Sequence, residues 1–205
     1  MILTKILSTE DPQAISRAKT VIQKEGTIAF PTDTIYGVAA DAFSTAGIQK
    51  IYEAKNRPQE KALPVLIGNL DQLALLVQFM SDEAERMMQA FWPGGLTLIL
   101  PKGPKVPPAL SSLPSIGIRM PKHPFTLKLL EETGPLATTS ANLSGGSNPV
   151  TAQDVSDQLG GRIDLILDGG ETPGPIPSTV VDLTGSSFAI LREGIISSAE
   201  IGALF

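Results

Sequence analysis

The 205-residue chain contains no cysteine and a single histidine, His123. Without cysteine it can form no disulfide bond, no thiolate zinc site and no cysteine nucleophile. One imidazole also argues against multi-histidine metal sites and an ordinary Ser-His-Asp triad. We therefore expect chemistry that uses neither a cysteine nucleophile nor the serine of such a triad. We also expect no metal ion bound tightly by the protein.

Long apolar runs and targeting signals are also missing. Hydrophobic residues make up 42% of the chain and charged residues 18%, and no apolar run approaches the ~20 residues that a membrane helix needs. The N-terminal sequence MILTKILSTEDP lacks the charged, apolar and small-residue order of a secretory signal. These features predict a soluble, cytoplasmic protein of one domain, residues 1–205, that does not bind membranes.

Positive charge is scarce and grouped. Sixteen Lys and Arg stand against 21 Asp and Glu, a net charge of -5, which argues against a surface that coats nucleic acid but permits a basic cleft. The groups are Lys55, Arg57 and Lys61; Lys102 and Lys105; and Arg119 and Lys122.

Hydrophobic periodicity predicts short strands mixed with helices. Strands are expected at residues 2–7, 27–30, 62–67, 96–101, 115–121, 135–141, 163–170, 178–184 and 188–194. Helices are expected at residues 11–26, 44–55, 70–77, 82–91, 126–132, 152–158 and 199–204. Because strict βαβ alternation is absent, and a tight TGSS turn joins the last two strands, we predict an α/β fold with one large, open, twisted mixed sheet.

Several polar clusters come at the ends of short apolar strands. They are PTDTIYG, SIGIRMP, TTSANLSGGSNP, PSTVVD and ILREG. Ligands of open sheets usually bind at such strand ends, where a rigid scaffold presents free donors from loops. The pattern predicts one composite site.

One of these clusters and the first group of cations have two interpretations each. The hydroxyl, amide and glycine groups of TTSANLSGGSNP suit an anion or phosphate cradle, but also an ordinary turn between strand and helix. The cations Lys55, Arg57 and Lys61 either complement a helix C-terminus and face solvent, or bind a polyphosphate, for which a guanidinium between two ammonium groups is well suited.

Other polar residues are constrained by their surroundings. The segment Thr32–Tyr36 is either a turn with a buried tyrosine or part of the site. Arg119 and Arg192 lie in apolar strands, so each must face solvent, a carboxylate or an anionic ligand. Trp92 is expected in the core and His123 at a helix cap. Neither a GxxxxGK[ST] loop nor a GxGxxG motif is present, which excludes a P-loop NTPase and this dinucleotide site.

Taken in order, FPTDTIYGVAADA, IYEAKNRPQEKALPVLI, WPGGLTLIL, GIRMPKHP, TTSANLSGGSNP, PSTVVDLT and ILREG resemble the YrdC-like domain family of threonylcarbamoyl-AMP synthases. The resemblance spans residues 15–194. It includes the paired KxR and SxN signature of that family, as Lys55 with Arg57 and Ser140 with Asn142.

The resemblance implies an enzyme that condenses L-threonine, bicarbonate and ATP into L-threonylcarbamoyl-AMP and pyrophosphate. Mg²⁺ would arrive on the triphosphate, and the product would serve N6-threonylcarbamoylation of tRNAs that read ANN codons, together with the other proteins of that modification. The implied fold is an open, twisted α/β sheet with a positively charged concave face.

The resemblance also implies roles for individual residues. Lys55 and Arg57 would be catalytic. Threonine would be bound by Thr34, Arg119, Thr138 and Ser178, with Arg119 gripping its carboxylate. ATP would be bound by Arg57, Lys61, Ser115, Ser140, Asn142, Asn148 and Arg192.

Three departures from the family pattern stand out. Leu66 occupies a position where related two-domain members carry a histidine that contacts threonine, and Asn148 stands where serine is usual. Those members also continue into a second domain, through a linker that closes over ATP. Because this chain ends at Phe205, we expect closure of the site to come from elsewhere or to be absent.

Two alternative functions are also compatible with the sequence. The same basic concave face could bind tRNA or double-stranded RNA without ATP chemistry, as a module acting in translation or ribosome assembly. A paralogue that processes another carbamoyl acceptor is the other alternative, although the presence of Thr34, Arg119 and Ser178 counts against it.

Overall fold

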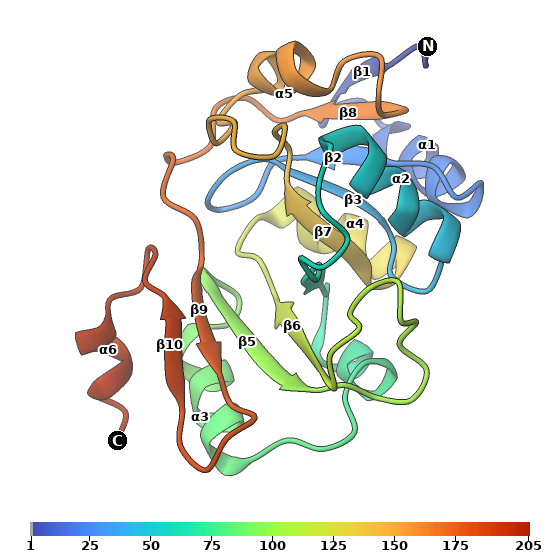
Figure 1. Ribbon diagram of the computed structural model, residues 1–205. Coiled ribbons are helices and arrows are strands. Elements are labelled where there is room, and N and C mark those ends of the chain that lie inside the picture. The colour runs from blue at the N-terminus through green and yellow to red at the C-terminus, as the bar shows by residue number, and fades with distance from the viewer. Residues whose placement is uncertain (1) are drawn as a thin grey trace.

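A ten-stranded mixed sheet organises the computed structural model, which describes residues 2–205 (Figure 1). The strands are β1 (Lys5–Ser8), β2 (Ile28–Phe30), β3 (Gly37–Asp41), β4 (Val65–Leu66), β5 (Leu96–Pro101), β6 (Ser115–Arg119), β7 (Leu136–Ser140), β8 (Leu165–Asp168), β9 (Thr179–Asp182) and β10 (Ala189–Arg192). Their order across the sheet is β1-β8-β2-β3-β7-β4-β6-β5-β9-β10. The prediction of a single α/β domain with one large mixed sheet is confirmed.

The pairing of the strands is parallel for β1 with β8, β2 with β8, β4 with β6 and β5 with β9, and antiparallel for the other neighbours. As predicted, the turn after β9 leads into an antiparallel β10. Strands β1 and β10 form the two edges of the sheet, and the chain termini lie on opposite sides of the molecule (Figure 1).

Six α-helices and one 3₁₀ helix accompany the sheet in residues 2–205. They are α1 (Ala14–Gln23), α2 (Thr45–Lys55), η1 (Leu70–Leu75), α3 (Asp82–Phe91), α4 (Pro124–Thr133), α5 (Ala152–Leu159) and α6 (Ser198–Gly202). Ser44 caps α2, because its side chain accepts a hydrogen bond from the Gly47 amide. His123 caps α4 by accepting from the Thr126 amide. Within residues 2–205, no helix combines the length and apolar character needed to cross a membrane.

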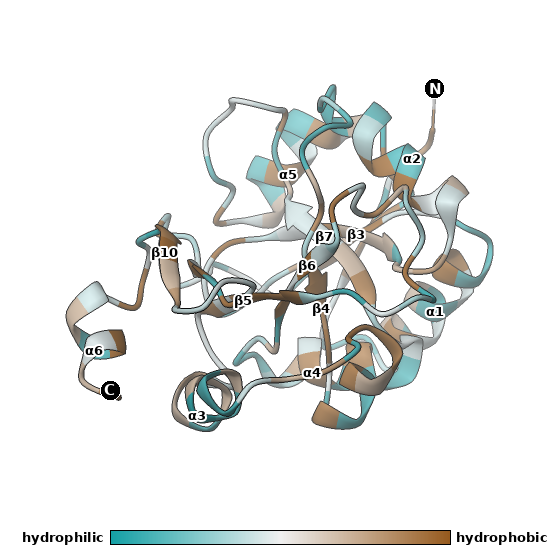
Figure 2. Cartoon of the chain, turned by 60° about the horizontal axis from the view of Figure 1, so that its bottom comes forward, coloured by the Kyte–Doolittle hydropathy of each residue, from teal (hydrophilic) through white to brown (hydrophobic). Residues whose placement is uncertain are grey.

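Both faces of the sheet are covered, and alternate strand residues enter different clusters of the core. In β2, Ala29 packs in the larger cluster, with α2, α3 and α5, whereas Ile28 and Phe30 pack in the smaller one, with α1 and α4. Figure 2 shows apolar residues concentrated along strands such as β4 and β5. Trp92 is buried in the larger cluster, as predicted, and its Nε1 donates to the Leu96 carbonyl.

The structure departs from the predicted elements in three places. Strand β3 was not predicted, because Gly37–Asp41 has few residues with high β-propensity; its pairing with β2 and β7 decides its conformation. Strand β4 is shorter than expected, since Pro64 has no amide proton to donate to a ladder. The helix predicted at residues 70–77 is the 3₁₀ helix η1.

Candidate functional site

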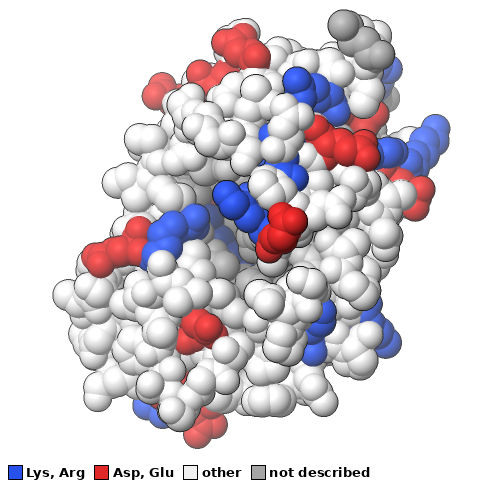
Figure 3. Space-filling view, viewed as in Figure 1, with Lys and Arg blue, Asp and Glu red and all other residues white. Residues whose placement is uncertain are grey.

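A cavity of about 540 Å³ lies between the loop after β2 and strands β5, β6, β7 and β9. Figure 3 shows that the face of the molecule seen in Figure 1 is hollowed near its centre, with Lys and Arg side chains beside the hollow. Most of the predicted site residues line the cavity, namely Thr34, Arg57, Ser115, Arg119, Thr138, Ser140, Asn148, Ser178 and Arg192. The polar clusters at the strand ends therefore do meet in one place.

Two parts of the cavity differ in exposure. We call Thr34, Leu66, Arg119, Thr138 and Ser178 the buried part, because all five are buried. We call Arg57, Ser115, Ser140, Asn148 and Arg192 the rim, because these residues are half-buried or exposed.

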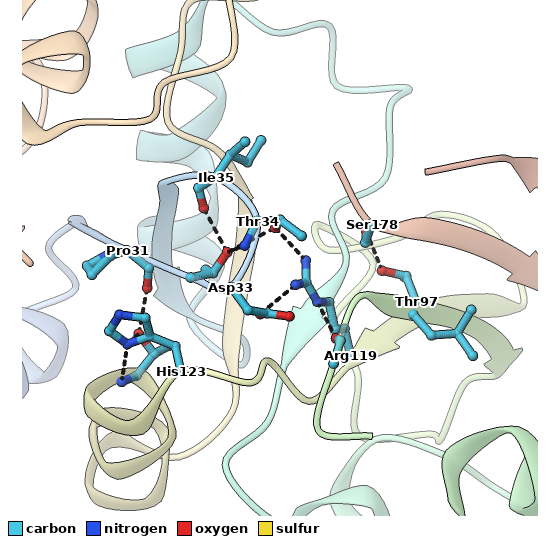
Figure 4. A network of polar contacts seen from close by, with 12 residues as sticks. Pro31, Asp33, Thr34, Ile35, Thr97, Arg119, His123 and Ser178 are labelled. Atoms are coloured by element: carbon cyan, nitrogen blue, oxygen red, sulfur yellow. Dashed lines mark hydrogen bonds and ion pairs between the residues drawn. The ribbon is translucent and has the colours of Figure 1, made fainter. Parts of the chain in front are cut away.

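Arg119 is the central group of the buried part. It is 6% exposed, and each of its three nitrogens already has a protein partner (Figure 4). Nε donates to the Gly94 carbonyl at 2.9 Å, Nη1 to Thr34 Oγ1 at 3.0 Å, and Nη2 to Asp33 Oδ1 at 2.7 Å. Since a guanidinium carries five N–H groups, one on each terminal nitrogen is left for a ligand. Arg119 is thus oriented before any ligand binds.

The charge of Arg119 is set by opposing effects. Burial lowers the pKa of its guanidinium, whereas the carboxylate of Asp33 raises it, and the positive charge of Arg192 lowers it again. Arginine remains protonated in proteins despite such shifts. The positive charge in the buried part is therefore paired in a salt bridge with the carboxylate of Asp33, which does not line the cavity.

The loop after β2 is held by its own hydroxyl groups. Thr32 Oγ1 accepts from the Thr34 amide and donates to the Ile35 carbonyl at 2.8 Å. Thr126 Oγ1, from the first turn of α4, donates to the Pro31 carbonyl at 2.6 Å (Figure 4). These bonds fix the position of the Thr34 hydroxyl relative to Arg119.

Hydroxyl groups from β5, from β7 and from Ser178, the residue before β9, complete the buried part. Thr97 on β5 shares a 2.9 Å hydrogen bond with Ser178, and Thr138 on β7 donates to the Leu136 carbonyl. Leu66 of β4 pairs with Arg119 in the parallel register and adds an apolar wall. This part can therefore accept a small ligand with both polar and methyl groups.

The rim carries two arginines with no carboxylate partner. Arg57 donates to the carbonyls of Lys61 and Ala62, and Arg192 donates to the carbonyl and hydroxyl of Ser178. Burial lowers the pKa of both guanidinium groups, but both stay charged. In the described part of the chain neither forms a salt bridge, so the rim offers net positive charge to an anion.

Three residues predicted to belong to the site do not line the cavity. Lys55 and Asn142 are buried beside it, and Lys61 is exposed outside it. The Lys55 ammonium donates to the Ser140 carbonyl and to both oxygens of Asn142. Burial, together with the nearby charge of Arg57, lowers the pKa of Lys55 to about 7.

The segment TTSANLSGGSNP, one interpretation of which was an anion cradle, also lies only partly in the cavity. We call residues 140–148 the serine loop. Of this loop, Ser140 and Asn148 line the cavity, whereas Ser144, Gly145 and Ser147 are exposed elsewhere. Only the two ends of the segment are therefore placed to contact a ligand in the cavity.

The pairing of Asp33 with Arg119 is the feature of the site that sequence reasoning missed. Arg119 was expected to face solvent, a carboxylate or an anionic ligand, but no rule of spacing connects two residues 86 positions apart. Asp33 stands beside Thr34 in PTDTIYG, and an acidic residue in a strand-end cluster was the available signal. Among residues 2–205 no group of three or more His, Cys, Asp or Glu is arranged to hold a metal ion.

Comparisons with known proteins identify the family of the chain. Residues 20–194 match the Sua5/YciO/YrdC family model, described as "Telomere recombination". The threonylcarbamoyl-AMP synthase of Bacillus subtilis is 42% identical over 205 residues, which cover 98% of this chain and 59% of that protein. The threonylcarbamoyl-AMP synthase of Pyrococcus abyssi is 42% identical over 176 residues, which cover 85% of this chain and 52% of that protein.

A solved structure gives a similar result. The chain is similar to P. abyssi Sua5 complexed with L-threonine, with a TM-score of 0.92 and 38% identity over 100% of this chain and 60% of that one. The chain thus spans little more than half the length of these relatives.

Proposed function

The chain belongs to the Sua5/YciO/YrdC family, and we propose that it is a threonylcarbamoyl-AMP synthase. The observation that carries the proposal is the division of one cavity into a neutral, hydrogen-bonded buried part and a positively charged rim. Similarity to synthases of two organisms and to a Sua5 structure with L-threonine supports it. The alternative of an RNA-binding module without this chemistry is not favoured, because these relatives are named as enzymes.

L-threonine is proposed to bind in the buried part. The two free N–H groups of Arg119 would receive its carboxylate, with Thr34, Thr138 and Ser178 close by to bond its polar groups. Leu66 would face its methyl group in place of the histidine contact expected from the family resemblance. Because Asp33, which does not line the cavity, offsets the charge of Arg119, the buried part is close to neutral, which suits a zwitterion.

ATP, as its Mg²⁺ complex, is proposed to bind at the rim. Arg57 and Arg192 would contact its phosphates, and Ser115, Ser140 and Asn148 supply neutral polar groups. Lys61 and Asn142 were expected among the ATP ligands; in the proposal Asn142 acts through the serine loop, and Lys61 would have to reach the nucleotide from outside the cavity.

The proposed reaction needs no protein nucleophile. The threonine amine attacks the carbon of bicarbonate, water leaves, and a carboxylate oxygen of the resulting carbamate attacks the α-phosphorus of ATP. The bond from the α-phosphorus to the bridging oxygen breaks, and pyrophosphate leaves with that oxygen. The protein holds three substrates close together and offsets charge at the transferred phosphorus, the contribution proposed for Arg57 and Arg192.

The product would then serve tRNA threonylcarbamoylation in the cytoplasm, together with the other proteins of that modification. We also propose that tRNA contacts the basic face of the protein directly. A titration of RNA binding between ~50 and 200 mM salt measures that contact, since binding through several phosphates weakens steeply over this range.

Pyrophosphate release from ATP and bicarbonate tests the proposed activity. We expect release to depend on L-threonine and to fall at least ~10-fold when L-serine replaces it, because serine lacks the methyl group that Leu66 would contact. Equal release with and without L-threonine would refute the proposal.

A further inference from the structure

The Lys55 side chain is almost completely buried at the end of α2. It is 2% exposed and does not line the cavity, although Arg57, two residues later, does. Asn56 explains the difference, because its left-handed conformation (φ 51°) turns the chain sharply after the helix. The two cations of the KxR motif therefore point to different places.

All three N–H groups of the Lys55 ammonium have an oxygen partner in the serine loop. The acceptors are the carbonyl of Ser140, the carbonyl of Asn142 and, at 3.3 Å, Asn142 Oδ1. An ammonium ion has three donors, so none is left for a phosphate. If the Lys55 ammonium broke one of these bonds to contact a ligand, a buried acceptor would lose its hydrogen-bond partner.

The same loop is held from a second direction. The Lys55 carbonyl accepts from the Ser144 amide at 2.9 Å. Asn142 extends this hydrogen-bond network within the loop. Its Oδ1 accepts from Ser140 Oγ, and its Nδ2 donates to the Gly146 carbonyl at 2.7 Å. Lys55 and Asn142 thus connect α2 to most of the serine loop.

We propose that Lys55 is a positioning residue, which holds the serine loop from behind so that Ser140 and Asn148 face the cavity, and that it does not contact the nucleotide. This inference rests on the proposed function in one respect, since ATP is taken as the ligand of the rim. It assigns different tasks within the KxR and SxN signature. Arg57 and Ser140 face the ligand, whereas Lys55 and Asn142 support them.

Steady-state kinetics of Lys55→Met test the assignment. Met keeps the length and apolar volume of the side chain but removes the ammonium. We expect the KM for ATP to rise at least ~10-fold, with kcat within ~3-fold of the parent protein, because binding is lost but no charge is removed from the transferred phosphoryl group. Lys50→Met is the matched control, since Lys50 lies on the same helix and donates to Glu25 at the surface. A ~100-fold fall in kcat with an unchanged KM for ATP would overturn the proposal.

Hydrogen exchange of the ligand-free protein gives a readout that needs no activity. In Lys55→Met the amides of Ser144 and Gly146 should exchange at least ~10-fold faster than in the parent protein, and in Lys50→Met they should not change. Unchanged exchange at both amides would contradict the proposal. Because no substrate is present, this result stays informative even if threonine-dependent pyrophosphate release is not found.

Acylation of the unaltered protein covers the case in which Lys55→Met does not fold. Native protein is treated with an amine-acylating reagent, with and without MgATP, and its peptides are analysed by mass spectrometry. Lys55 should stay unmodified in both samples, while the exposed Lys61 is modified without nucleotide. Modification of Lys55 that MgATP prevents would show an ammonium facing the nucleotide and would overturn the proposal.

Discussion

The buried part of the cavity and its rim use arginine in opposite ways. In the buried part, Arg119 is neutralised by Asp33 and oriented by Thr34 and Gly94. At the rim, Arg57 and Arg192 bond only to carbonyl and hydroxyl oxygens, so their charges are not offset by a neighbouring carboxylate. The first arrangement suits a small ligand whose own charges cancel, and the second suits a polyanion.

The difference also indicates where specificity is decided. A buried site rejects a ligand that cannot bond to its free polar groups, because those groups would then be buried without a partner. An exposed guanidinium can adjust to several phosphate positions. We therefore expect discrimination among amino acids in the buried part, and mainly charge compensation at the rim.

The largest expected effect comes from removing the central group of the buried part. Arg119→Ala should lower kcat/KM for threonine by roughly 1000-fold, because a charge-assisted contact to the carboxylate is lost. It should also destabilise the fold by about 3 kcal/mol, since Asp33 keeps a partly buried charge without its partner. Pyrophosphate release and urea unfolding measure the two effects.

A double variant separates these two consequences of Arg119→Ala. Arg119→Ala combined with Asp33→Ala should recover most of the free energy of unfolding, because no unpaired charge remains, but none of the activity. Recovery of activity in the double variant would show that Arg119 does not bind the substrate.

At the rim, Arg57→Ala should slow pyrophosphate release by roughly 30- to 1000-fold, the usual effect of losing a charge that stabilises the transferred phosphoryl group. Because Arg57 has no carboxylate partner, the free energy of unfolding should change by less than about 1 kcal/mol. Arg17→Ala is the matched control, since Arg17 is exposed on α1 and bonds to Gln13. A large loss of stability in Arg57→Ala would mean that the rim is as tightly organised as the buried part.

Ser178 lies where the two parts meet, because it bonds to Thr97 on one side and to Arg192 on the other. Ser178→Ala should raise the KM for both threonine and ATP by about 5-fold, corresponding to a net hydrogen-bond contribution of about 1 kcal/mol. Initial-rate measurements with each substrate varied in turn check this. An increase confined to one substrate would place Ser178 in one part only.

The smallest expected effect concerns pH and the support of the buried part. Burial lowers the pKa of His123, and the charge of Asp33 only partly opposes this. His123 Nδ1 accepts the cap bond from the Thr126 amide, which requires an unprotonated Nδ1. Since the pKa is lower in the folded state, the unfolded chain binds more protons below about pH 6.5. Stability should therefore be fully present above that pH and be lost as pH falls through the folded-state pKa.

The variant His123→Asn keeps a capping oxygen without this titration. Urea unfolding from pH 5 to 8 should show a decrease in stability at low pH, of the order of a cap bond, about 1 kcal/mol, in the parent protein and a smaller one in the variant. Equal pH dependence in both proteins would exclude His123 as its source.

Much of the site could be predicted from strand-end clusters. Thr34, Arg119 and Ser178 come from segments far apart in the chain, and the rule that loops at strand ends hold ligands brought them together correctly. The requirement that a buried arginine meet a carboxylate or an anion was also sound, because Arg119 meets Asp33. Its partner could not be named, since pairing across the fold leaves no fixed spacing in sequence.

Lys55 shows why a charge pattern does not give side-chain direction. One interpretation of Lys55, Arg57 and Lys61 was a polyphosphate site, but of the three only Arg57 lines the cavity. The left-handed turn at Asn56 and the acceptors of the serine loop decide where the Lys55 ammonium lies. Strand β3 is a similar case, because neighbouring strands on both sides impose a conformation that its small residues do not favour.

Composition and periodicity by themselves determined the α/β class, the absence of cysteine chemistry, most strands and helices, and the set of polar segments that form the cavity. These are local properties, or follow from the alternation of apolar residues. Only the tertiary structure decided that Arg119 is neutralised, that the rim arginines are not, and that Lys55 supports the site from behind. Each of these depends on how far a charge is buried and on which partners long-range packing brings close to it, because a buried charge is costly without a partner.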